Sequence, residues 1–230
     1  MSNYTPLLIS HIPKTAGTSL KRLVEKYHPD TVFAYKQELA LGSPDIEFIR
    51  KFRERPKPRI VMGHFSFGVH RLLGVEPNYT SIFREPIQRV VSLYRYQITL
   101  TESPFARELE SGMTLSEFVT SGITPMTNNH MCRMVSGVAP EDGIILKDKW
   151  LLEYALHNLE HYYHDIGIVE RYEHSLTKLA KVLGWSDHKP PMENVTTGGA
   201  LVVDKETYEI LYESNQLDVE LYKKVLDMCQ

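Results

Sequence analysis

Short apolar runs alternate with stretches of helical periodicity along most of the chain. Residues 6–12 have the pattern of a buried strand, and residues 18–27 follow with four apolar side chains spaced for one helical face. The same patterns predict strands at residues 59–63, 79–83 and 164–169, and helices at 43–53, 86–100, 114–120, 127–135, 147–162 and 174–183, with two more within 204–228. Apolar strands alternating with helices predict an α/β fold with a mostly parallel central sheet flanked by helices.

The number and spacing of these elements suit one domain that covers residues 1–230. Residues 101–143 stand apart, because short helical patterns are separated there by Gly, Pro and Ser. We expect this segment to form a helical cap or insertion over an acceptor site.

Composition excludes several classes of protein. A formal net charge of −3 lacks the excess of Lys and Arg of a general nucleic-acid binder. The two cysteines, Cys132 and Cys229, lie too far apart for a CxxC motif or a disulfide framework. No run of 18 apolar residues occurs, and the opening residues lack a basic region before a long apolar stretch. We therefore expect a cytoplasmic protein without a membrane partner, and its oligomeric state stays open.

The turn after the first predicted strand has the composition of a phosphate-binding loop. Exposed backbone N–H groups and the positive end of a helix dipole favour an anion there, by about 0.3–1 kcal/mol for the dipole alone. The candidate ligands are Lys14, Thr15, Ala16, Gly17, Thr18 and Ser19. In the alternative interpretation, Thr18 only caps the helix and Lys14 is a solvated turn residue.

The loop differs from that of nucleotide triphosphatases. In GxxxxGK[ST] the lysine follows the last glycine, whereas Lys14 precedes Gly17 by three positions. A triphosphate with Mg²⁺ fits this order poorly.

A second candidate phosphate site follows the strand predicted at 79–83. Arg84 lies at the carboxyl end of that strand, where open α/β sheets bind ligands, and Ser92 lies on the next helix. Together they suit a second phosphate, with a charge-assisted contact from the guanidinium. The alternative is a surface pair between Arg84 and Glu85, or one made by Arg89, beside a proline that opens the helix.

Taken together, these segments resemble sulfotransferases that use 3′-phosphoadenosine-5′-phosphosulfate, most closely the carbohydrate group that includes heparan-sulfate 2-O-sulfotransferases. HIPKTAGTSL is similar to the family's 5′-phosphosulfate loop, SIFREPIQRVVSLYRY to its 3′-phosphate strand and helix, and VMGHFSFG to the segment with the catalytic base. Weaker similarities continue through NNHMCR, GIVERYEHSL and MENVT.

The resemblance implies a P-loop-like sulfotransferase fold with that cofactor and the product adenosine 3′,5′-bisphosphate. Lys14 to Ser19 then bind the 5′-phosphosulfate, Arg84 and Ser92 bind the 3′-phosphate, and His64 deprotonates the acceptor hydroxyl. Two departures stand out. Glu85 replaces the family's usual Asp, and the carbohydrate enzymes are typically membrane-anchored in the secretory pathway, whereas we expect no anchor here. The inference of the cofactor survives both departures, and the inference of the substrate does not.

The chemistry fits the residues. Sulfuryl transfer by in-line attack needs aligned oxygens and stabilised charge, which Lys14, hydroxyls and backbone amides provide without a required metal ion. The ordinary pKa of His64, near 6.5, suits a base at neutral pH, and the alternative is a packed structural histidine. His11 lies beside the loop, either bonded to it or at a strand end, and His70 is a lesser candidate base.

Other candidates remain open. A helix would place His157, His161 and His164 on one face, where they could ligate zinc, although a solvated stripe is the simpler interpretation. Asn128, Asn129 and Arg133 are candidates for the acceptor or nucleotide side. Tyrosines suited to an acceptor cleft, or to core packing, are Tyr94, Tyr96, Tyr162, Tyr163 and Tyr172.

Three functions compete at this stage. The first is a sulfotransferase acting on a hydroxyl of a carbohydrate or small metabolite. The second is a nucleotide or metabolite kinase that uses the same loop, and the third is a catalytically inactive protein that retains the nucleotide site.

Overall fold

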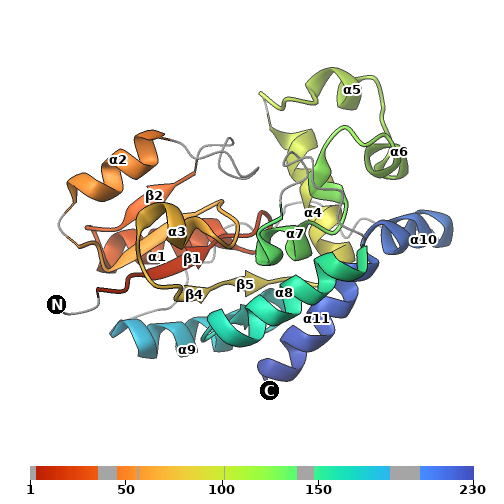
Figure 1. Cartoon of the computed structure of the whole chain (residues 1–230). Coiled ribbons are helices and arrows are strands. Elements are labelled where there is room, and N and C mark those ends of the chain that lie inside the picture. Colours follow the sequence, from red (N-terminus) through yellow and green to blue (C-terminus); the bar gives the residue numbers. More distant parts are fainter. Residues whose placement is uncertain (1–3, 36–45, 56, 101, 139–147, 187–202) are drawn as a thin grey trace.

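A parallel sheet organises the chain. The structure, a computed structural model, describes residues 4–35, 46–55, 57–100, 102–138, 148–186 and 203–230. Strands β1 (Leu7–Ser10), β2 (Val32–Ala34), β3 (Ile60–Gly63) and β4 (Tyr79–Thr80) pair in parallel in the order β2-β3-β1-β4 (Figure 1). Only Ser81 separates β4 from β5 (Ile82–Phe83), which pairs in parallel with β6 (Gly167–Ile168). The predicted α/β fold is confirmed.

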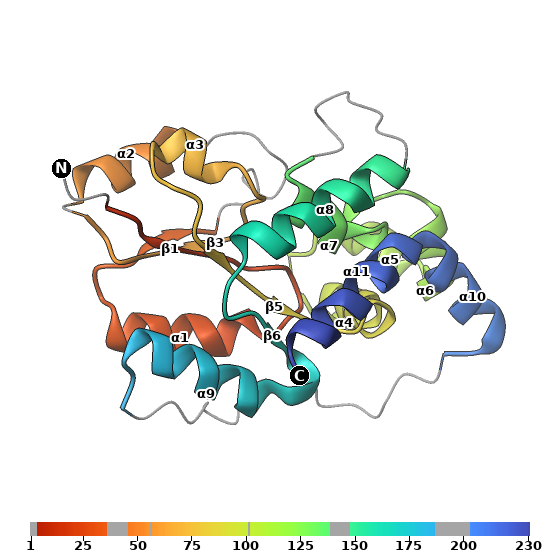
Figure 2. The same cartoon turned by 60° about the horizontal axis from the view of Figure 1, so that its bottom comes forward.

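Helices cover both faces of the sheet. On one face, α1 (Gly17–Tyr27) and α9 (Tyr172–Leu183) pack against Ile9, Ile60 and Met62. The opposite face carries Leu8 and Val61. It is covered by α2 (Ile46–Glu54), α3 (Val69–Leu73), α7 (His130–Ser136), α8 (Asp148–Tyr162) and α11 (Gln216–Met228), as Figure 2 shows. Neighbouring strand residues point to opposite faces, so buried parallel strands are apolar throughout.

A smaller cluster lies beyond the sheet. Helix α4 (Pro86–Thr99) extends from β5 and packs against α5 (Ala106–Glu110), α6 (Leu115–Thr120) and α10 (Lys205–Ser214). The apolar side chains of this cluster include Val91 of α4, Val119 of α6 and Leu211 of α10. Part of the segment 101–143 thus forms a helical lobe, whereas α7 belongs to the main core. The role of this segment as a cap over an acceptor stays a prediction.

Two buried polar side chains join α7 to α11 by capping each other's helix. Asn129 Oδ1 accepts hydrogen bonds from the N–H groups of Leu217 (3.0 Å) and Asp218 (3.2 Å). Asp218, which is fully buried, accepts from the N–H groups of Met131 (3.0 Å) and Cys132 (2.7 Å). First-turn N–H groups have no partner within their own helix, so each side chain satisfies donors that burial would otherwise leave unpaired.

Several element boundaries differ from the sequence prediction. The sequence missed β2 and α3, because three and five residues are too few to show a period. The helix predicted at 127–135 is wrong at its start, where the left-handed Asn129 separates a 3₁₀ turn (Pro125–Thr127) from α7. The strand predicted at 164–169 shrinks to β6, since a 3₁₀ turn (Val169–Arg171) ends it. The first three residues of the helix predicted at 43–53 lie outside the described residues.

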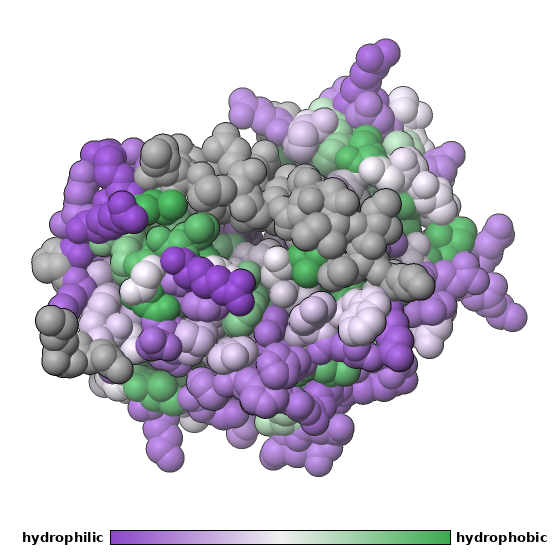
Figure 3. All heavy atoms as spheres, in the orientation of Figure 1, coloured by the Kyte–Doolittle hydropathy of each residue, from purple (hydrophilic) through white to green (hydrophobic). Residues whose placement is uncertain are grey.

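The molecular surface agrees with these amphipathic elements. Figure 3 shows that the region of α8, α9 and α11 is mainly hydrophilic on the face in view, with hydrophobic atoms gathered over α3, where Leu72 is 43% exposed. Among the described residues, no helix is both long and apolar enough to cross a membrane.

Candidate functional site

The turn between β1 and α1 (residues 11–16, the β1–α1 loop) is an unusual backbone. Lys14 and Ala16 have φ angles of 73° and 62°, in the left-handed region that disfavours residues with a Cβ. Helix α1 begins at Gly17 with no side-chain cap, and its first turn holds no acidic residue. The alternative that Thr18 caps the helix is wrong, because Thr18 is exposed inside the first turn. The first N–H groups therefore remain available to an anion.

Gly17 is required by its neighbour in the same loop. A Cβ at this position would lie 1.6 Å from Nε2 of His11, so the His11 imidazole occupies the space where any other residue would place a side chain. His11 Nδ1 is buried without a hydrogen-bond partner in the described part of the chain. Burial, with the charges of His64 and Lys14, lowers the pKa of His11 well below its usual value, so the ring is neutral.

Hydrogen bonds fix the rest of the loop. The buried hydroxyl of Thr15 donates to the carbonyl of Ile12 (2.8 Å), so Thr15 braces the turn through its side chain. From α9, the hydroxyl of Tyr172 donates to the carbonyl of Ala16 (3.3 Å). Ser19 is buried in the first turn of α1.

Arg84 meets this loop, although it lies 70 residues further along the chain. Its Nη1 donates to the carbonyl of Lys14 at 3.3 Å, because β5, which forms a second sheet with β6, directly follows β4, the parallel neighbour of β1. Burial lowers the pKa of Arg84, while the carboxylates of Glu170 and Glu85 oppose that shift. The structure thus brings the two predicted phosphate segments together.

The alternative of surface pairs at this segment is wrong. Glu85 caps α4, where its carboxylate accepts from the N–H groups of Ile87 (3.2 Å) and Gln88 (2.7 Å). Arg89 is fully buried, and its Nη2 donates to the carbonyl of Met126 at 2.7 Å. The extra methylene of Glu85 lets the side chain curl back onto the helix, so the departure from Asp keeps a capping carboxylate.

Lys14 carries a charge that its surroundings disfavour. Burial and then the like charge of Arg84 lower its pKa to about 8. Its Nζ lies 3.8 Å from the centre of the Tyr96 ring on α4. Ser92 is half-buried one turn earlier on the same face of α4, since residues four apart in a helix are neighbours.

His64 lies beside the loop with a defined tautomer. Its Nδ1 is 2.7 Å from the carbonyl oxygen of His11, and because a carbonyl only accepts, Nδ1 carries the proton. Nε2 then keeps a lone pair. Burial lowers the pKa of His64, so the neutral form dominates near pH 7. Gly63 allows this placement, since a Cβ there would come within 1.9 Å of the carbonyl of Ala34.

Sequence reasoning missed several neighbours of His64. The Tyr35 ring meets the His64 ring edge-on at 5.0 Å, and its hydroxyl has no partner among the described residues. His130 is buried, and its pKa is lowered well below the usual value by burial and by the charges of Arg89 and His64. The sequence analysis named Tyr96 only as a tyrosine of an acceptor cleft or of the core, and His130 only within the NNHMCR similarity, whereas Tyr35 had no signal in the sequence.

Other candidates have structural partners. Nδ1 of His70 lies 2.8 Å from the hydroxyl of Tyr79, in the core. The hydroxyl of Tyr94 donates to the carbonyl of Met113, and Tyr163 is buried against Tyr79. Tyr162 packs against Phe67, with ring centres 5.3 Å apart. These residues pack or brace the fold, as the core-packing interpretation predicts.

The histidine stripe and the asparagine segment also differ from expectation. His157 and His161 stack at 4.2 Å on α8, but that helix ends at Tyr162, so His164 does not share its face. In the part of the chain that the structure describes, no three His, Cys, Asp or Glu side chains converge as metal ligands. The Asn129 side chain is occupied by its cap of α11, and Arg133 binds Asn128 through Nε and Nη2.

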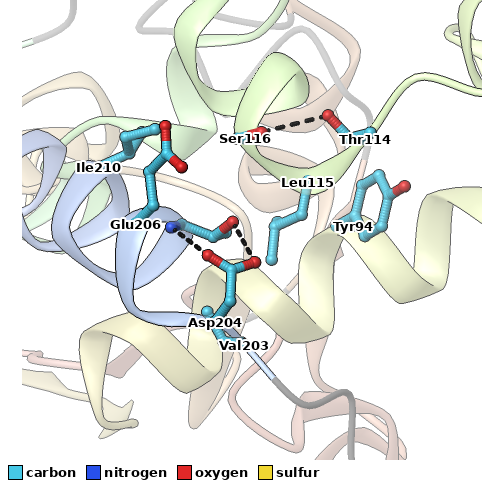
Figure 4. A pocket seen from close by; sticks show the side chains of 9 residues that line it. Tyr94, Thr114, Leu115, Ser116, Val203, Asp204, Glu206 and Ile210 are labelled. Atoms are coloured by element: carbon cyan, nitrogen blue, oxygen red, sulfur yellow. Dashed lines mark hydrogen bonds between the residues drawn. The ribbon is translucent and has the colours of Figure 1, made fainter.

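A separate cavity of about 480 Å³ lies between α4, the start of α6 and the start of α10. Asp204 accepts hydrogen bonds from the N–H and hydroxyl groups of Thr207. Figure 4 shows Thr114 bonded to Ser116, so these polar groups satisfy one another. None of the residues predicted to bind phosphate lines this cavity.

Comparisons with known proteins agree with this geometry. Residues 1–224 match the profile of a family described as "Sulfotransferase family". The heparan sulfate 2-O-sulfotransferase 1 of Xenopus laevis is 26% identical over 195 residues, covering 77% of this chain and 54% of the relative. The human protein of that name is 24% identical over 194 residues, with the same coverage. This chain thus spans about half the length of these curated relatives.

A solved structure shares the fold. The sulfotransferase from Alicyclobacillus acidocaldarius superimposes with a TM-score of 0.55 at 13% sequence identity. The match covers 97% of this chain and 96% of that one, so the architecture is common to both along their lengths.

Proposed function

The chain belongs to the sulfotransferase family, and we propose that it transfers the sulfuryl group of 3′-phosphoadenosine-5′-phosphosulfate to a hydroxyl of a carbohydrate. One observation carries the proposal. Arg84 Nη1 contacts the Lys14 carbonyl of the β1–α1 loop at 3.3 Å, and His64 is bonded to the same loop through the His11 carbonyl.

The residues present suit this cofactor. Lys14 and Arg84 repel each other, and no carboxylate lies within ion-pair distance of Lys14 in the described chain. An anion with two charged groups would relieve that repulsion and accept hydrogen bonds from the free N–H groups of α1. Lys14 to Ser19 would hold the 5′-phosphosulfate, and Arg84 with Ser92 the 3′-phosphate. When bound, the cofactor supplies an activated sulfuryl group, and adenosine 3′,5′-bisphosphate is the product.

The protein contributes a base and a fixed positive charge. His64 would accept the proton of the acceptor hydroxyl at Nε2, because the His11 carbonyl holds the other proton on Nδ1. Lys14, protonated below its pKa of about 8, would place positive charge beside the phosphate oxygen that gains negative charge. The bond to the His11 carbonyl keeps the His64 ring in position before substrate arrives, so alignment of the base costs little during the reaction.

The acceptor class follows from the relatives. Those named above are heparan sulfate 2-O-sulfotransferases, which supports a carbohydrate hydroxyl as the acceptor. We also propose a cytoplasmic location, which the two free cysteines support.

Calorimetric titration tests cofactor use. We expect adenosine 3′,5′-bisphosphate to bind more tightly than ATP with Mg²⁺, and Arg84→Ala to weaken the bisphosphate by about 2–5 kcal/mol through loss of a charged partner. Tighter ATP binding would instead indicate the kinase. An acceptor screen with sulfate-labelled donor then tests transfer, and cofactor binding without transfer to any carbohydrate would indicate the inactive protein.

A further inference from the structure

The contact between Lys14 and Tyr96 is the closest cation–ring contact among the described residues. Nζ lies 3.8 Å from the Tyr96 ring centre, whereas the other lysines approach rings at 4.9 to 5.8 Å. A cation over an aromatic face is attracted by the ring's negative face within about 6 Å. The geometry at Lys14 is therefore the strongest of its kind in this part of the protein.

The Tyr96 ring offers the Lys14 ammonium an attractive contact that its charged neighbours do not provide. Its charged neighbour is Arg84, which repels it, and His11 is held neutral by burial. The Lys14 backbone is itself in the left-handed region, so its side chain leaves the loop from a strained position. The four-carbon side chain of Lys14 is flexible, so its ammonium group keeps one position only when a neighbouring group binds it.

Tyr96 is an exposed aromatic residue that does not belong to the hydrophobic core. The residue is 45% exposed and lies outside the apolar cluster around α4, to which Tyr94 belongs. Tyr96 shares its helical face with Ser92, one turn closer to Arg84. A ring at this place holds the ammonium beside both predicted phosphate segments.

On these grounds we propose that Tyr96 is a positioning residue of the cofactor site, whose ring holds the Lys14 ammonium in place for the phosphosulfate. The inference rests on the proposed function. Its physical content, that the ring stabilises the charged ammonium, concerns the free protein and is measurable without any ligand.

The first experiment measures the pKa of Lys14 in free protein, from the pH dependence of its acetylation by acetic anhydride, read by mass spectrometry. Tyr96→Leu removes the ring, and we expect the midpoint to fall by about 0.4–0.7 pH unit, equal to a 2.5- to 5-fold change in the protonation equilibrium. Tyr96→Phe keeps the ring and should restore the wild-type midpoint. Tyr208→Leu, which removes a tyrosine of 48% exposure on α10, is the matched control.

The second experiment titrates the same proteins with adenosine 3′,5′-bisphosphate at pH 7. We expect Tyr96→Leu to weaken binding by about 2- to 5-fold and Tyr96→Phe to bind like wild type, since the face of the ring makes the contact. Unchanged midpoint and affinity in Tyr96→Leu, with wild type still binding, would overturn the inference alone. Failure of the wild type to bind would overturn the proposed function and this inference with it.

Discussion

Replacing Gly17 by Ala tests how the β1–α1 loop is built. A Cβ at Gly17 would lie 1.6 Å from Nε2 of His11, whereas ordinary contact begins at 3.4 Å, so the imidazole must move by about 1.8 Å. That ring is confined by His64, with ring centres 4.5 Å apart, and by Tyr35 at 5.5 Å. The loop backbone must therefore shift with the ring.

The energetic consequences of Gly17→Ala differ between stability and binding. Overpacking costs about 1–3 kcal/mol, and the less flexible unfolded chain returns about 0.4–1 kcal/mol. The net loss is roughly 0–2.6 kcal/mol, which lowers Tm by at most about 10 °C for a chain of this size. Displacement of loop N–H groups by 1 Å or more is expected to lower cofactor affinity and turnover roughly 10²-fold.

Calorimetry with adenosine 3′,5′-bisphosphate and thermal denaturation measure the two effects separately. Gly184→Ala is the matched control, because its φ of 74° costs a side chain about 1–2 kcal/mol while the space around it is open. His11→Ala combined with Gly17→Ala removes the clash and should regain affinity over the single variant. If Gly17→Ala alone binds the bisphosphate like wild type, the account of the loop is wrong.

Three further outcomes are expected. Asp218→Ala leaves two buried N–H groups without acceptors, so the free energy of unfolding in chemical denaturation should fall by about 3–5 kcal/mol. Removal of the exposed cap in Asp204→Ala should lower it by about 1 kcal/mol. Equal losses of stability in the two variants would contradict the reciprocal caps. His64→Asn should lower turnover about 10²–10⁴-fold while bisphosphate affinity is kept, and full turnover at saturating substrate would remove His64 as the base. Because the anion favours protonated Lys14, whose pKa is about 8, affinity should change little between about pH 7 and that pH and fall above it. An equally steep fall in Lys14→Ala would assign the titration to another group.

Local pattern accounts for the parts of the site that lie within one segment. The sequence predicted the β1–α1 loop, because small residues, hydroxyls and Lys14 follow one strand directly. It also placed Arg84 at a strand end and Ser92 on the helix that follows, where the structure has them. Each of these inferences needs only the order of neighbouring residues and the period of one element.

Contacts between segments escaped the same reasoning. The strand β2 shows no pattern of its own, and it exists because β3 pairs with it along Val32–Ala34. The place of Tyr96 over Lys14 depends on the angle at which α4 leaves β5, and the tautomer of His64 on the His11 carbonyl 53 residues away.

The sequence by itself determined the succession of strands and helices and the two segments that bear the candidate phosphate ligands, since hydrophobic periodicity and turn chemistry act over a few residues. The tertiary structure alone decided that Arg84 contacts the Lys14 carbonyl and that His64 contacts the His11 carbonyl of the same loop. Parallel strands that are remote in sequence bring their carboxyl ends to one edge only after the strand order is set, and that order is fixed by burial on both faces of the sheet.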